Sequence, residues 1–110
     1  MRHFFKALAC SWSGFLVLLG EAAFRQELAV LFAALSAVCW RRGIPALGAA
    51  LPWGLLVLVA EALNTGIEKT VDLCTQEWHP LAKAAKDAAS FACGMAILAF
   101  VLVCARELFL

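Results

Sequence analysis

The sequence predicts an all-α membrane protein with three transmembrane helices, preceded by an amphipathic helix in the membrane interface, within one domain of residues 1–110. Composition is the first evidence: 65% of the residues are hydrophobic, 15% are charged, and the mean hydropathy is +0.89. On folding, a soluble domain of this size buries only about 60–65% of the surface that its unfolded chain exposes. The apolar surface that remains here therefore needs lipid or oligomer contacts. The second evidence is a series of uncharged stretches, which cover residues 28–40, 44–60 and 88–105.

The first expected element, residues 4–19, is apolar but carries polar residues near its start, among them Lys6 and Ser11. Such a mixture suits a helix that lies in the membrane interface, with Trp12 at the depth of the lipid headgroups. A cleaved signal peptide would also combine a charged start with an apolar centre, but no small-x-small cleavage site stands cleanly before a mature domain. We therefore expect an interfacial helix here.

Three membrane helices are expected to follow, over residues 21–40, 44–69 and 86–106. A span needs about 20 mostly apolar residues, and the second and third uncharged stretches nearly reach that length unaided. The first reaches it if its helix begins at Glu21 or Ala22 and keeps its charged residues at the interface, where long side chains can snorkel. Three spans is the most economical count.

The connections indicate how these helices are arranged. The segment from Arg41 to Pro45 contains two adjacent arginines, a glycine and a proline, which predict a very short turn. The first two spans should therefore be antiparallel neighbours. The second connection, residues 69–86, is longer and polar. Lys and Arg residues on its side of the membrane outnumber those on the other, which predicts that the amino end and this connection are cytoplasmic. The two sets are Arg2, Lys6, Arg25, Lys69, Lys83 and Lys86 against Arg41, Arg42 and Arg106.

A row of polar residues, Glu61, Asn64, Glu68 and Asp72, ends the second span. At 100° per residue their side chains fall within roughly an 80° arc of one helical face, so they can converge on one point. Ionisable groups at membrane depth are costly unless they are paired, hydrated or bound to a cation. The row therefore indicates a functional site, although Asn64 and Asp72 also have a simpler interpretation as hydrogen-bonding groups of a helix end.

Further charged residues should meet this row at the same interface, namely Glu21, Glu27, Lys86 and Asp87. Carboxylates without His or Cys companions suit a hard cation such as Mg²⁺, which binds through one or two carboxylates plus phosphate oxygens of a substrate. A carboxylate left free can act as a general base, and a lysine can neutralise charge on a phosphoryl group. The pattern is typical of a kinase that uses metal-bound ATP.

Simpler interpretations of these outer residues remain open. Glu21 and Arg25 have the spacing of an i,i+4 ion pair, and Lys86 and Asp87 could anchor and cap the third helix. Glu27 could be a solvated residue at a helix end, as isolated carboxylates in such places commonly are.

Other classes of function lack support. The net charge is only +1 and no basic cluster contains interleaved aromatics, so no nucleic-acid partner is expected. The phosphate-binding motif G-x-x-x-x-G-K-[ST] and the Gly-rich kinase loop are absent, which excludes the common soluble kinase classes. The five cysteines show no C-x-x-C spacing, so we interpret them as small core residues.

Three motifs together suggest a family. EAAFRQE (21–27), EALNTGIEKTVD (61–72) and AKDAAS (85–90) resemble the small bacterial integral-membrane diacylglycerol kinases, and the resemblance covers residues 6–105. It implies transfer of the ATP γ-phosphoryl group to the primary hydroxyl of 1,2-diacylglycerol, giving phosphatidic acid, with Mg²⁺ required. It also implies a homotrimer in the bacterial inner membrane, with active sites on the cytoplasmic side between neighbouring subunits.

The resemblance assigns a role to each matching residue. It makes Glu61 the base that takes the proton of the lipid hydroxyl, and it makes Glu21 and Glu68 the carboxylates that hold the metal–ATP complex. The remaining residues would serve the nucleotide: Asn64 near the phosphates, Lys86 on the phosphate chain, and Asp72 and Asp87 in support of the pocket.

The sequence departs from the family pattern at a few positions. Gly20 stands where Asn is usual, and Cys10 and Trp78 stand where relatives often carry Tyr, so the aromatic contacts to the nucleotide base are open. None of these changes removes a group needed for phosphoryl transfer.

Two alternatives remain. An undecaprenol kinase would use the same polar set on another lipid hydroxyl, although EAAFRQE favours the diacylglycerol branch. A small multidrug or ion transporter, the remote alternative, would place its key acid near the middle of the membrane, whereas the acids here crowd one interface.

Overall fold

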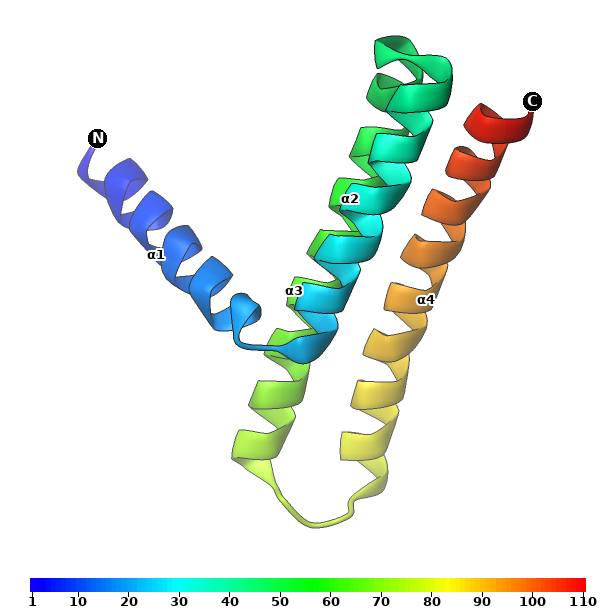
Figure 1. Ribbon diagram of the computed structural model, residues 1–110. Coiled ribbons are helices and arrows are strands. Elements are labelled where there is room, and N and C mark those ends of the chain that lie inside the picture. Colours follow the sequence, from blue (N-terminus) through cyan, green and yellow to red (C-terminus); the bar gives the residue numbers. More distant parts are fainter.

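The protein is described here from a computed structural model of residues 1–110, which consists of four α-helices (Figure 1). Three of them are long and apolar enough to span a membrane. The predicted class, an all-α membrane protein with three spans, is therefore confirmed. The helices are α1 (Arg2–Leu19), α2 (Ala22–Arg42), α3 (Ile44–Cys74) and α4 (Pro80–Phe109).

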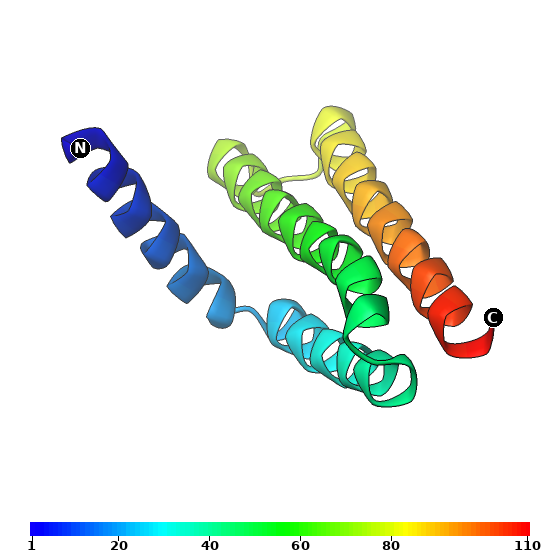
Figure 2. The same ribbon diagram turned by 90° about the horizontal axis from the view of Figure 1, so that it is seen from above.

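Helix α1 leaves the bundle at an angle and buries none of its residues within the chain (Figures 1 and 2). Its end is attached to α2 by aromatic contacts, in which the rings of Phe15 and Phe24 meet edge to face with centroids 6.2 Å apart. Trp12 lies against Phe15 on the preceding turn. The apolar side chains of α1 are thus available to lipid or to another subunit, and its interfacial position stays a prediction.

The turn between α2 and α3 has the expected brevity because Gly43 adopts a backbone angle that other residues avoid. Its φ is 84°, in the region where a Cβ atom is strained, and its N–H closes α2 by donating to the Cys39 carbonyl at 2.8 Å. Pro45 follows in the first turn of α3, where a missing N–H costs nothing. The two helices therefore run antiparallel, as predicted.

Helix α3 is the centre of the bundle, because its contacts with α2 and with α4 are each more extensive than those between α2 and α4. Its buried residues recur at steps of three and four along one face: Ala46, Ala50, Gly54, Val57, Glu61 and Thr65. Small residues on this face allow close approach, and a Cβ atom added to Gly54 would lie 3.3 Å from the Phe100 ring and 3.5 Å from Leu31. Glu61 thus continues a stripe that is otherwise built for packing.

The second connection is shorter than the predicted polar segment of residues 69–86. Helix α3 continues to Cys74 and α4 begins at Pro80, so only residues 75–79 lack helical structure. Only the part of a helix that lies inside lipid has to be apolar. The polar residues at the end of α3 and at the start of α4 therefore continue these helices beyond the lipid. His79 caps α4, since its Nδ1 accepts a hydrogen bond from the Leu81 N–H at 3.1 Å.

Candidate active site

Every predicted site residue lies at one end of the bundle, because the antiparallel arrangement places the start of α2, the end of α3 and the start of α4 together (Figure 1). We call this the polar end; it carries Glu21, Glu61, Asn64, Glu68, Asp72, Lys86 and Asp87. The row on α3 does not meet at a single point within one chain. It divides into three groups with different neighbours.

The first group surrounds Glu61, which is 7% exposed. The thiol of Cys93, on α4, donates to Glu61 Oε2 with an Sγ–O distance of 3.6 Å. The carboxyl of Glu27, on α2, faces Glu61 from the other side. No Lys, Arg or His forms an ion pair with Glu61. A buried carboxylate that lacks a cation retains its capacity to accept a proton.

Glu27 has a more central place in the site than its simple interpretation as a solvated helix-end residue predicts. One of its oxygens, Oε2, is buried and receives no hydrogen bond, and the Glu61 carboxyl is a neighbour of the Glu27 carboxyl. Two carboxylates in contact repel each other unless a proton or a cation lies between them. The signal was in the helical spacing, since Glu27 is three residues after Phe24 and four before Leu31, and both of those are buried.

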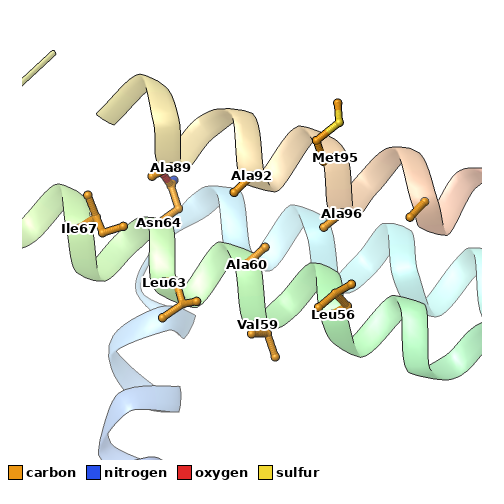
Figure 3. A pocket seen from close by; sticks show the side chains of 11 residues that line it. Leu56, Val59, Ala60, Leu63, Asn64, Ile67, Ala89, Ala92, Met95 and Ala96 are labelled. Carbon is orange, nitrogen blue, oxygen red and sulfur yellow. The ribbon is translucent and has the colours of Figure 1, made fainter. Parts of the chain in front are cut away.

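The second group joins Asn64 to Glu68. Asn64 Nδ2 donates to Glu68 Oε1 at 3.1 Å, while Asn64 Oδ1 is buried without a partner. Figure 3 shows Asn64 between α3 and α4, next to Ala89. It is the one polar residue that lines an otherwise apolar hollow of about 480 Å³. An unpaired oxygen beside a carboxylate is a place where a cation or a donor from a ligand would be stabilised.

The third group lies where α3 and α4 end and begin. Lys86 Nζ donates to Asp72 Oδ1 at 2.6 Å, which links the two helices, and Lys83 Nζ donates to Asp87 Oδ2 at 2.6 Å within α4. These four side chains border a polar cavity of about 450 Å³ that Trp78 and His79 also line. The cavity therefore offers charged groups together with an aromatic ring.

Glu21 stands apart from these groups, at the position just before α2. Its Oε1 forms an ion pair with Lys69 Nζ of α3 at 3.1 Å. The alternative pairing of Glu21 with Arg25 is not formed, because Arg25 Nη1 instead donates to the Leu19 carbonyl at 2.7 Å. That bond ties the start of α2 to the end of α1.

The polar end has the chemistry that a magnesium–nucleotide complex requires. No three His, Cys, Asp or Glu side chains gather into a metal centre within the chain. Mg²⁺ does not need such a centre, since it typically uses one or two carboxylates and takes further oxygens from water and phosphate. Glu68, Glu21 and the unpaired Asn64 oxygen supply hard oxygen ligands of this kind. The residues present therefore fit the expected ion.

An apolar groove of about 530 Å³ lies between α2 and α4. Its only polar lining residues are Gln26 and Glu27, near the start of α2, and it extends along α4 as far as Phe109. Because Glu27 faces Glu61, the groove ends beside the buried carboxylate. The apolar groove therefore ends near an acid, Glu61, that forms no ion pair.

Comparison with known proteins places the chain among membrane kinases. The family model "Prokaryotic diacylglycerol kinase" matches residues 9–107. The chain belongs to the prokaryotic diacylglycerol kinase family. The similarity extends to single proteins named diacylglycerol kinase.

Each of these relatives covers most of the kinase chain. The Sinorhizobium protein is 40% identical over 101 residues, which are 90% of this chain and 73% of the relative. The Pseudomonas aeruginosa protein is 43% identical over 97 residues, or 84% and 76%. The Escherichia coli K12 protein is 37% identical over 100 residues, or 88% and 81%. The predicted family and the predicted kinase class are confirmed, whereas the roles of single residues stay predictions.

Proposed function

We propose that this kinase transfers the γ-phosphoryl group of ATP to the hydroxyl of 1,2-diacylglycerol, giving phosphatidic acid and ADP. Family membership supports the reaction class. The observation that carries the proposal for this chain is the position of Glu61, which is buried and has no cation partner. It neighbours Glu27, which lines the end of an apolar groove. A lipid alcohol requires such a combination, because its chains need apolar surface and its hydroxyl needs a base.

The groove between α2 and α4 is the proposed place for an acyl chain. Its lining is almost entirely hydrophobic, and a lipid that lay along it would direct its headgroup toward Gln26 and Glu27. Glu61 lies beside Glu27, so the free hydroxyl would come within reach of the Glu61 carboxylate. The groove thus orients the acceptor, and orientation of reactants is a major part of rate enhancement.

Glu61 is proposed to accept the hydroxyl proton as the lipid oxygen bonds to the γ-phosphorus. The bond between that phosphorus and the oxygen that bridges to the β-phosphate breaks, and ADP leaves with that oxygen. Cys93 holds one carboxylate oxygen, and the other stays available to the substrate. General-base catalysis of this kind contributes about 10²–10⁴-fold to a rate.

The nucleotide is proposed to bind at the remaining groups of the polar end. Glu21 and Glu68, with the Asn64 oxygen, would hold Mg²⁺, which when bound neutralises phosphate charge and aligns the γ-phosphoryl group. Lys86 would contact the phosphate chain, while Asp72 and Asp87 keep Lys86 and Lys83 in place. Trp78 borders the same cavity and offers a ring to the base.

We further propose that the kinase is a homotrimer in the bacterial inner membrane, with the polar end in the cytoplasm. The excess of Lys and Arg at that end favours this orientation. Helix α1 buries no residue in its own chain, and large apolar residues of α3 such as Leu63, which is 64% exposed, face outward. Neighbouring subunits would cover such surfaces and bring the separate groups of the polar end together.

The test is a transfer assay with radiolabelled ATP and Mg²⁺ on the purified protein in mixed micelles, with diacylglycerol and undecaprenol offered separately. We expect labelled phosphatidic acid in clear preference to labelled polyprenyl phosphate, and about 10²–10⁴-fold less product from the Glu61→Gln variant. The reverse preference would replace the proposed substrate by undecaprenol. Absence of any labelled lipid from folded protein would contradict both proposed lipid acceptors.

A further inference from the structure

Lys69 connects two helices at the polar end through a contact that the proposed reaction does not use. It lies on α3, next to Glu68 in the chain, and its Nζ lies 3.1 Å from Oε1 of Glu21 on α2. The two side chains keep 57% and 41% of their exposure, so water reaches both. An exposed pair of this kind adds little to stability. Stability therefore does not explain why Lys69 pairs with Glu21, a proposed metal ligand.

The ammonium group of Lys69 occupies one of the two carboxylate oxygens of Glu21, Oε1. A carboxylate oxygen that accepts an N–H bond at this distance has a lone pair engaged and its charge partly neutralised. A divalent cation that binds the same oxygen must first displace the ammonium. Since the pair is exposed and weak, displacement is inexpensive for a ligand that brings several interactions of its own.

The other proposed metal ligand lacks this protection. Glu68 receives only the neutral amide N–H of Asn64, and no cation lies on it. Lys83 and Lys86 are engaged with Asp87 and Asp72 and leave Glu68 free. Lys69 is therefore the single cation in the chain that contacts a carboxylate assigned to the metal.

We propose that Lys69 is a placeholder cation at Glu21, which lowers the affinity of the empty site for a free divalent metal and yields to a metal–nucleoside triphosphate complex. The inference rests on the proposed role of Glu21 in metal binding. Its consequence is selectivity: phosphate oxygens complete the coordination shell of a metal–nucleotide complex, whereas the bare ion must compete with Lys69 for one of two carboxylates.

The experiment measures binding of Mn²⁺ alone to the full chain in detergent, without nucleotide, by the loss of the free-ion electron paramagnetic resonance signal. Lys69→Gln should tighten Mn²⁺ binding by up to about fivefold, the order expected when the ion no longer has to displace an exposed ion pair. Lys69→Arg, which keeps the charge, should bind Mn²⁺ like the parent protein. Lys6→Gln is the matched control, because it removes the same unit charge from a lysine that forms no ion pair.

The outcomes separate this inference from the proposal beneath it. If Lys69→Gln and Lys6→Gln bind Mn²⁺ with equal affinity, Lys69 is not a placeholder cation at Glu21. If Glu21→Gln removes the gain produced by Lys69→Gln, the gain acts through Glu21, as proposed. Unchanged Mn²⁺ binding in Glu21→Gln would overturn the metal role of Glu21 and the placeholder with it, while the lipid transfer assay would still report on the kinase activity independently.

Discussion

Glu61 and Asp72 belong to the same polar row on α3, yet their surroundings differ in every respect that matters for chemistry. Glu61 is 7% exposed, contacts a thiol and a second carboxyl, and has no cation. The side chain of Asp72 is 50% exposed and bonds to Lys86 at 2.6 Å. A carboxylate that forms an ion pair with a lysine is a poor proton acceptor, but it keeps the lysine side chain in position. One helical face therefore carries two acids in different chemical environments.

The cost of the Glu61 environment strengthens this distinction. Burial of a charged group without a partner is expensive, and a well-packed apolar residue would be cheaper at that point of the α3 stripe. Its neighbours on the stripe, Val57 and Thr65, show what packing alone would place there. The exposed Asp72–Lys86 pair, in contrast, costs little and contributes little. Function is therefore the better explanation for Glu61.

The largest effect is expected where the buried acid is neutralised. Glu61→Gln keeps the size of the side chain but removes its basicity, so lipid phosphorylation should fall by about 10²–10⁴-fold. The radiolabel assay measures the loss, and an unchanged elution profile in detergent shows that the oligomer is intact. Near-normal turnover would remove Glu61 from the role of base.

A smaller effect is expected at Glu68, which accepts a hydrogen bond from the neutral amide of Asn64 and forms no ion pair. Glu68→Gln should weaken the apparent affinity for Mg·ATP by about tenfold or more, because a charged interaction of roughly 1.5–3 kcal/mol is lost. Titration of Mg²⁺ at fixed ATP measures the shift. An unchanged dependence on Mg²⁺ would count against ligation by Glu68.

Asp72→Asn should have a modest effect that is confined to nucleotide binding. The exposed pair with Lys86 is worth about 0–1 kcal/mol, so the KM for ATP should rise less than about fivefold and kcat should stay near the parent value. Initial rates over a range of ATP concentrations separate the two constants. A collapse of kcat comparable to that of Glu61→Gln would erase the difference between the two acids.

The smallest effect is expected at Cys93, whose thiol is a weak donor to Glu61. Cys93→Val keeps the volume close and removes the S–H group, and kcat should fall by no more than about threefold, since weak sulfur bonds are second-order interactions. Cys93→Ser, which retains a donor, should restore most of the rate. Equal rates in all three proteins would show that the thiol does not orient Glu61.

The sequence predicted the helices well because lipid imposes a simple rule on their composition. The uncharged stretches located α2, α3 and α4, and the Arg-Arg-Gly-Ile-Pro segment located the turn at Gly43. The extension of α3 to Cys74 was not foreseen, because polar residues outside lipid follow helix propensity and capping instead of hydropathy.

The candidate site was predictable by residue type but not by pairing. Spacing on α3 identified its polar row, because one helix fixes its own faces. The contacts of Glu27 with Glu61 and of Lys69 with Glu21 join different helices, and the rotation of one helix against another cannot be read from either sequence segment alone. The same reason hid the donation from Cys93.

The most direct test of the division between the two functions is equilibrium binding of radiolabelled Mg·ATP to Glu61→Gln, with Glu68→Gln measured beside it. If the buried acid serves proton transfer and the outer groups hold the nucleotide, Glu61→Gln binds Mg·ATP with the affinity of the parent protein although it phosphorylates lipid about 10²–10⁴-fold more slowly. Glu68→Gln then binds Mg·ATP more weakly. Loss of nucleotide binding in Glu61→Gln as large as that in Glu68→Gln would contradict the account.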